Sequence, residues 1–357
     1  MRVVPLDKVK TGMITERAVW DIDGKLLLGK GTRIDEGYLK RLKEIGVPAL
    51  YIFDERIGKV EYEEVLSERT RMETLKMTRE VMQNVKLDSS FDILKVNQVV
   101  NDLITEMMKS KDLLVAMVDM RTANDAGFYH SLNTTVLSVI TGIALGYNPQ
   151  KLEQLACGAL FHDIGILLLP AELINKRTPL TPEENAQVMK HTELGFDILR
   201  KKSGVSLLSA HVALQHHEKF DGSGYPRGIA GQEISDLARI VSITAIYDDL
   251  VSISTGSGQV VPHQAVEYLT SYSGKWFDPD ILRVFITIIA LFPVGSTVVL
   301  NSGDTGLVTK ANKKFPTRPI IRVFRDYQGN DLNPPFEIDL AQNHDYFVKD
   351  ILNYDEA

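Results

Sequence analysis

Apolar residues recur every three or four positions over many consecutive segments between residue 91 and about residue 292, and glycine or proline separates the segments. Such spacing places the apolar side chains of each segment on one face of an α-helix, so that neighbouring helices can bury these faces together. One helix start is explicit in Thr181-Pro182-Glu183-Glu184, where threonine caps, proline takes the first helical position and Glu184 completes a capping box. The pattern predicts an all-helical core over residues 91–292.

The two ends of the chain differ from this helical region. Residues 1–55 contain a turn sequence at 21–24, a short helical pattern that Asp35 opens and Gly46 stops, and a strand pattern at 49–53. Residues 293–357 contain β-rich runs separated by Gly, Asp and Asn. We therefore expect a mainly α fold, with a small mixed α/β accessory region at the N-terminus and a small β domain at the C-terminus.

Residues 56–90 are rich in charge and carry apolar residues at helical spacing. This pattern predicts a long, exposed helix that links the first region to the core. Two roles are open for this helix. We favour a solvated connector, and the alternative is a dimerisation helix, which would make the protein a homodimer.

Composition restricts where the protein works and what it binds. Hydrophobic residues make up 44% and charged residues 24% of the chain, as in ordinary globular proteins. The net charge of −7 argues against a nucleic-acid polymer as partner, although bound metal ions could still hold a phosphate ligand. Cys157 is the single cysteine, so no disulfide forms within one chain and a cytoplasmic location fits. The longest apolar run, residues 284–294, is too short for membrane insertion.

Six of the eight histidines lie between residues 130 and 217. We expect His130 to open one helix, His162-Asp163 to close another, and His191 to lie nearly three turns into the helix that Thr181 caps. His216-His217 precede a glycine-rich turn. A lone histidine in an apolar helix is most often a core residue, but histidine and aspartate are also common ligands of divalent metals. A carboxylate beside a histidine can bridge two ions, which can hold a phosphoryl group and activate water.

Three strings decide between these alternatives: FHDIG at 161–165, HTELG at 191–195 and HHEKFDGSGYPRGIAGQEI at 216–234. Together they resemble the bacterial HD-GYP family, the branch of the HD superfamily that linearises cyclic di-GMP to pGpG or onward to GMP. The resemblance covers roughly residues 120–290, and its most specific part is Gly224-Tyr225-Pro226 after His-His-Glu. It implies a helical HD core, a divalent metal cofactor and cyclic di-GMP as the ligand.

The resemblance also assigns roles to individual residues. It makes His162 and Asp163 the catalytic pair, with Asp163 as the bridge between two metals. The metal ligands that it implies are His130, His162, Asp163, His191, His216 and His217. The metal would be iron or manganese, with one or two ions in each chain. His211, His263 and His344 match no ligand of the family.

For the nucleotide pocket, the resemblance implies a lining of Gly224, Tyr225 and Pro226, where the tyrosine ring contacts guanine. Asp248, which matches a later aspartate of the family, joins the substrate-binding residues. Asp221 and Gly222 shape the turn, and we explain Asp221 as a cap of that turn rather than a ligand.

Three places depart from the family pattern. Active relatives carry a metal-binding aspartate where this chain has Ala245, and nearly one turn later Asp248 or Asp249 would reach the metal only if the helix shifted. Ile166 replaces a lysine that contacts phosphate, and residues 251–257 lack the usual basic residues. Each charge-assisted bond lost in this way is worth about 1.5–3 kcal/mol when buried.

Two functions follow from this mixture of retained and lost residues. The first, which we favour, is a metal-dependent phosphodiesterase that hydrolyses cyclic di-GMP. The second is a catalytically impaired relative that binds cyclic di-GMP or another nucleotide and acts on signalling partners as a sensor or adaptor. Hydrolysis of a different phosphate ester is a third alternative, which the Gly-Tyr-Pro string opposes.

Overall fold

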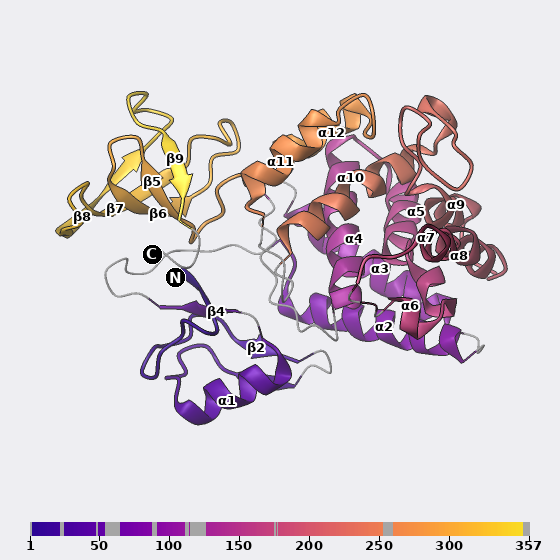
Figure 1. Ribbon diagram of the computed structural model, residues 1–357, viewed down its shortest axis with the longest axis horizontal. Coiled ribbons are helices and arrows are strands. Elements are labelled where there is room, and N and C mark those ends of the chain that lie inside the picture. The colour runs from indigo at the N-terminus through magenta and orange to yellow at the C-terminus, as the bar shows by residue number, and fades with distance from the viewer. Residues whose placement is uncertain are drawn as a thin grey trace.

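Helix α4 (Ala126–Ala144) runs through the middle of the helical region and is buried over most of its length. It contacts α2 (Glu68–Lys86), α3 (Ile93–Lys109), α5 (Pro149–Leu160), α10 (Asp236–Val251) and α12 (Pro279–Ile288). The computed structural model describes residues 2–21, 25–47, 49–53, 65–87, 91–110, 114, 126–174, 176, 178–252 and 260–352. Figure 1 shows these helices gathered into one bundle, with the two β-containing ends of the chain beside it.

Shorter elements complete the bundle. They are the 3-10 helices η1 (Ile164–Leu168) and η2 (Gly231–Glu233) and the α-helices α6 (Ala171–Ile174), α7 (Pro182–Met189), α8 (His191–Arg200), α9 (Leu207–Gln215) and α11 (Pro262–Ser271). The predicted capping box is confirmed, since Thr181 accepts from the Glu184 backbone and the Glu184 side chain accepts from the Thr181 backbone. Among the described residues, no helix combines the length and apolar character that crossing a bilayer requires.

The N-terminal region has a small apolar cluster of its own. Strand β1 (Arg2–Pro5) pairs antiparallel with β4 (Ala49–Ile52), and β2 (Val19–Trp20) pairs with β3 (Leu26–Leu28). Helix α1 (Glu36–Ile45) begins after its cap Asp35 and ends at Gly46, as expected. The strands on either side of the predicted turn are therefore paired, while residues 22–24 lie outside the described part of the chain.

The C-terminal region is a five-stranded antiparallel sheet in the order β8-β7-β6-β5-β9. Its strands are β5 (Thr297–Leu300), β6 (Thr305–Lys310), β7 (Ile320–Arg325), β8 (Asp331–Asp339) and β9 (Val348–Ile351). Several of its buried side chains, such as Val298 and Ile321, belong to the same apolar cluster as the helices, while Leu307 and Phe324 form a small cluster of their own. The mainly α fold with small β-containing regions at both ends is confirmed, and the domain boundaries stay a prediction.

The expectation of an exposed helix over residues 56–90 is wrong for α2. Leu75, Met77 and Val81 are almost fully buried and pack in the main apolar cluster. Thr74 and Thr78 are buried too, because each hydroxyl donates to the backbone carbonyl four residues earlier and so needs no water. Since α2 packs against its own chain, this helix gives no further support to a homodimer.

Two histidines occupy different places on their helices from those predicted. The described part of α4 already begins at Ala126, so His130 lies one turn inside the helix. The helix that Thr181 caps ends at Met189, and His191 begins a new helix, α8. The break has a local cause, because the side chains of His191 and Thr192 bond to the carbonyls of Val188 and Met189 at the end of α7.

Candidate metal centre

Three histidines follow directly after the carboxyl ends of helices. His162 comes just after α5, His191 just after α7 and His216 just after α9. Each ring nitrogen Nδ1 donates to the backbone carbonyl three residues earlier, which the end of the helix leaves without a helical partner. The partners are Ala159 at 2.7 Å, Val188 at 2.7 Å and Ala213 at 3.0 Å. Because Nδ1 holds a hydrogen, the neutral form of each ring presents a lone pair on Nε2.

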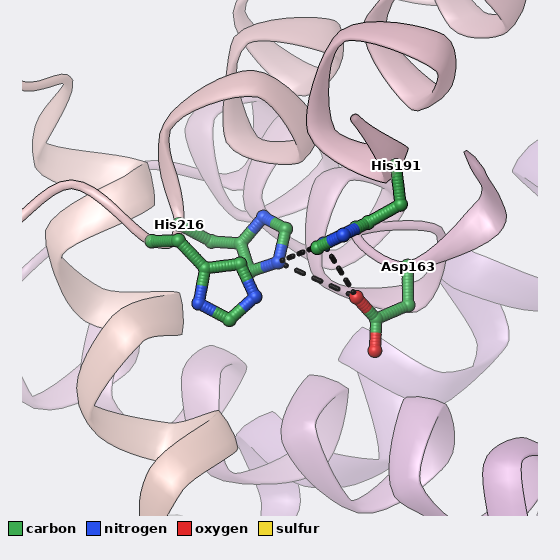
Figure 2. A group of neighbouring side chains, drawn as sticks. Asp163, His191 and His216 are labelled. Atoms are coloured by element: carbon green, nitrogen blue, oxygen red, sulfur yellow. Dashed lines mark hydrogen bonds and ion pairs between the residues drawn. The ribbon is translucent and has the colours of Figure 1, made fainter. Parts of the chain in front are cut away.

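These lone pairs converge on the carboxylate of Asp163, which lies in the turn between α5 and η1. Its Oδ2 is 3.4 Å from His162 Nε2, whereas its Oδ1 is 3.4 Å from both His191 Nε2 and His216 Nε2. Figure 2 shows Asp163 facing His191 and His216, with the two rings turned toward its oxygen. The two oxygens thus face different histidines, as a bridging carboxylate requires.

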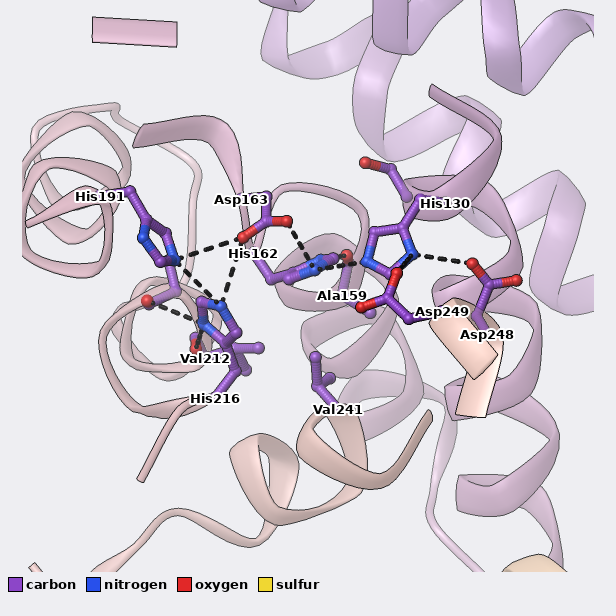
Figure 3. Close-up of polar contacts among 12 residues, drawn as sticks. His130, Ala159, His162, Asp163, His191, Val212, His216, Val241, Asp248 and Asp249 are labelled. Carbon is purple, nitrogen blue, oxygen red and sulfur yellow. Dashed lines mark hydrogen bonds and ion pairs between the residues drawn. The ribbon is translucent and has the colours of Figure 1, made fainter. Parts of the chain in front are cut away.

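His130 completes a second group on the other side of Asp163. Its Nε2 lies 3.2 Å from His162 Nε2, and its Nδ1 lies 2.7 Å from Asp248 Oδ2 (Figure 3). We call the set His130, His162 and Asp163 site A, and the set Asp163, His191, His216 and His217 site B; within each set, the donor atoms lie within 4.8 Å of one another. The predicted metal ligands therefore form two adjacent sets that share Asp163.

The spacing of the donors fits a divalent metal ion. Metal–nitrogen bonds of about 2.0–2.1 Å at tetrahedral or octahedral angles place neighbouring ligand atoms roughly 2.8–3.4 Å apart. The nitrogens of His191 and His216 are 3.4 Å apart and those of His130 and His162 are 3.2 Å apart. A mixed imidazole and carboxylate set suits several first-row divalent ions, so the geometry does not select the metal.

Electrostatics prepare site B for a cation rather than for protons. Burial lowers the pKa of His216 to about 4 and also lowers that of His217. Although burial alone would raise the pKa of Asp163, His162 and His216 hold it well below the usual range. His130 differs, because Asp248 and Asp249 outweigh burial and raise its pKa to about 9. A metal entering site A must therefore displace a proton from His130.

The Gly-Tyr-Pro turn lies against site B. The Tyr225 ring stacks on the His217 ring, with centroids 4.7 Å apart and planes within 17°. A Cβ atom on Gly224 would lie 2.3 Å from the Lys219 nitrogen, so only glycine fits there, and Pro226 follows in the same turn. Asp221 accepts from the backbone nitrogen of Ser223 at 2.9 Å, which confirms its role as a cap of the turn.

Asp248 has different surroundings from the other predicted substrate-binding residues. It is fully buried, its Oδ2 pairs with His130, and its Oδ1 accepts from the Asn133 side chain at 2.9 Å. These contacts suit a carboxylate that orients His130. The substrate-binding role of Asp248 stays a prediction.

The departures from the family pattern can also be located. Ala245 is 8% exposed on α10, and Ile166 lies in η1. Asp248 and Asp249 both contact Nδ1 of His130 from a continuous α10, and the expectation that either reaches the metal only if the helix shifts stays a prediction. Most of the segment 251–257 lies outside the described residues, which stop at 252 and resume at 260.

Two residues that support the centre had no predicted role. Asn133 holds Asp248 with its side-chain amide. The buried Glu218 accepts from the Arg227 backbone at 2.8 Å and so ties the two sides of the Gly-Tyr-Pro turn together. Only Glu218 had a signal in the sequence, as the third letter of the His-His-Glu string.

Two family models match parts of this chain. Residues 112–281 match the family model of the HD domain, and residues 297–357 match that of a KOW domain associated with the HD domain. The chain is 26% identical over 262 residues to the cyclic di-GMP phosphodiesterase PA4108 of Pseudomonas aeruginosa, which is 73% of this chain and 63% of that protein. It is 31% identical over 188 residues to a cyclic di-GMP phosphodiesterase of Thermotoga maritima, which is 52% of this chain and 50% of the relative.

The chain thus spans less than two thirds of the length of these curated relatives. Among solved structures, Bd1817, a HDG"Y"P protein from Bdellovibrio bacteriovorus, aligns with 79% of this chain and 97% of its own, at a TM-score of 0.49 and 18% identity.

Proposed function

We propose that this chain, whose residues 112–281 match the HD domain model, is a member of the HD-GYP branch and a metal-dependent phosphodiesterase that hydrolyses cyclic di-GMP to pGpG or GMP. The observation that carries the proposal is the pair of adjacent donor sets that share the two oxygens of Asp163. Two divalent ions, when bound, supply Lewis acidity toward a phosphodiester and an activated water. We propose iron or manganese for both sites.

The residues of the chain would hold and orient the reacting groups. Asp163 would offer one oxygen to each site, which fixes the spacing between the two ions. Tyr225, stacked on His217, would let a guanine base extend the stack, and Gly224 and Pro226 would line the same pocket. Burial raises the pKa of Tyr225, so its hydroxyl keeps its proton and can donate to an oxygen of the dinucleotide. The single, buried Cys157 supports a reducing cytoplasm as the location.

The test is a turnover assay on protein purified anaerobically and reconstituted with ferrous iron or manganese, with metal counted on the same sample. The proposal predicts a linear product from cyclic di-GMP and about two metal ions per chain. Asp163→Asn should abolish turnover and reduce the metal content, because it removes an anionic oxygen from both sites. His344→Gln is the matched control, since His344 is exposed in the C-terminal sheet region. Intact cyclic di-GMP after incubation with fully loaded protein would refute the proposal.

A second candidate is a sensor or adaptor that binds cyclic di-GMP without turning it over and acts on signalling partners. The observation in its favour is Ala245, a small apolar side chain at the position of a metal-binding aspartate, together with Ile166. Calorimetry on the metal-loaded protein distinguishes the two. Tight binding of a ligand that is recovered unchanged after hours supports the sensor, and hydrolysis supports the enzyme.

A further inference from the structure

Site A has one ligand fewer than site B. It offers the imidazoles of His130 and His162 and one oxygen of Asp163, and the family's additional aspartate is replaced by Ala245. A dication held by two neutral imidazoles and half of a shared carboxylate keeps most of its charge unbalanced. Another carboxylate within reach of this site would therefore strengthen it.

Asp248 is poorly placed to be that carboxylate, although it contacts His130. Its two oxygens are already engaged, one with His130 Nδ1 and the other with the Asn133 amide. It is also fully buried, so its carboxylate has little room to turn. Turning Asp248 toward a metal would leave His130 and Asn133 without their partner.

Asp249 is free of these constraints. It follows Ala245 by four residues on α10, so the two positions lie one turn apart on the same face of the helix. Its side chain is 72% exposed, and its Oδ1 lies 3.3 Å from His130 Nδ1. Figure 3 shows this carboxylate next to the His130 ring.

We propose that Asp249 supplies to site A the carboxylate that relatives carry at position 245. The carboxylate now lies at Nδ1 of His130, so its side chain would rotate toward Nε2 to bind the metal while α10 stays in place. The missing ligand has thus moved by one helical turn rather than disappeared. This inference rests on the proposed function, because it takes sites A and B to be the two metal sites of the phosphodiesterase.

Manganese binding tests the inference without reference to activity. Free Mn²⁺ is followed by electron paramagnetic resonance while metal-free protein is titrated, which gives the number of ions and the affinity of each. Wild type should bind two ions. Asp249→Asn keeps the shape of the side chain and removes its charge. It should weaken the binding of one ion by at least roughly 10–100-fold, the loss of affinity that removal of an outer-shell partner causes. Asp280→Asn removes one exposed charge from α12, far along the chain, and should change nothing.

A compensating variant keeps the test decisive. Ala245→Asp combined with Asp249→Asn returns a carboxylate to the position used by relatives, and it should restore the second ion. If Asp249→Asn binds two ions with wild-type affinities, the inference is overturned and the proposed function stands. If wild type and Asp249→Asn both bind a single ion, the inference is again overturned, and cyclic di-GMP turnover by the same wild-type sample decides the proposed function separately.

Discussion

Gly165 lies where η1 meets the start of α8, and the contact leaves no space for a side chain. A Cβ atom on Gly165 would lie 2.0 Å from the carbonyl oxygen of His191 and 2.6 Å from the backbone nitrogen of Gly195. The two segments that meet here carry Asp163 and His191, whose donor atoms are 3.4 Å apart. The absent side chain therefore sets the distance between two donors of site B.

We predict that Gly165→Ala pushes these segments apart by about 1 Å, because Cβ atoms essentially never lie within 3.0 Å of such an atom. Crowding a close-packed contact costs about 1–3 kcal/mol of unfolding free energy. Metal–ligand distances tolerate only about 0.2 Å. The ion in site B should therefore be lost, or bound far more weakly, in a variant that still folds.

Two measurements check this prediction: urea unfolding followed by circular dichroism, and manganese binding by the folded protein. Gly195→Ala is the matched control, since its Cβ would meet Ala213 at 3.3 Å and the Gly165 nitrogen at 3.4 Å, contacts that small adjustments relieve. It should retain both ions. The reasoning fails if Gly165→Ala keeps wild-type stability and wild-type manganese affinity.

Two further predictions concern the same centre. Tyr225→Phe keeps the stack on His217 but removes a hydrogen-bond donor. For the proposed hydrolysis of cyclic di-GMP, kcat/KM should therefore fall about tenfold, which corresponds to roughly 1.4 kcal/mol of lost transition-state stabilisation, while the metal content stays unchanged. An equal fall in metal content would contradict a role of Tyr225 in substrate binding. In protein freed of metal by a chelator, the low pKa of His216 means that the unfolded chain binds more protons than the folded chain between about pH 6.5 and 4. The free energy of unfolding should therefore decrease as the pH falls through this window, by up to about 3 kcal/mol. His130, with its pKa raised to about 9, acts in the opposite window, since its contribution is fully present below about pH 6.5 and is lost as the pH rises through 9. Thermal melting from pH 4 to 9 separates the two effects, and a flat acid limb would show that His216 is not held neutral by burial.

Signals that depend on a few neighbouring residues were readable from the sequence. The capping box at Thr181 and the turn cap at Asp221 both involve partners within three residues, so residue type and spacing were sufficient. The burial of α2 was not readable, because Thr74 and Thr78 count as polar until their hydroxyls are seen bonded to their own helix. The break before His191 was missed for a similar reason, since a side chain there replaces a backbone partner.

Other contacts of the centre join residues that lie far apart in the sequence. Nothing local indicates that Asn133 holds Asp248, because 115 residues separate them. In the sequence pattern, Ala245 marks the loss of a metal ligand. In the fold, Asp249 lies beside His130 from a position one helical turn after Ala245. The carboxylates that one face of α10 presents to the histidines therefore say more about possible metal ligands than the residue at a single position of the sequence pattern.

The arrangement of the helix ends explains why the histidines form a metal centre rather than an ordinary buried cluster. The carboxyl ends of α5, α7 and α9 meet here, and each carries roughly half a negative charge from its aligned peptide dipoles. The Nδ1–H groups neutralise the terminal carbonyls, so in site B the lone pairs of His191 and His216 and the Asp163 carboxylate all face one point. Lone pairs and a carboxylate in such an arrangement repel one another unless a positive charge lies between them. His216 does not provide that charge near neutral pH, because burial lowers its pKa and keeps the ring neutral. A metal cation can accept the lone pairs of several ligands at once, so one ion in site B would satisfy all of these groups together.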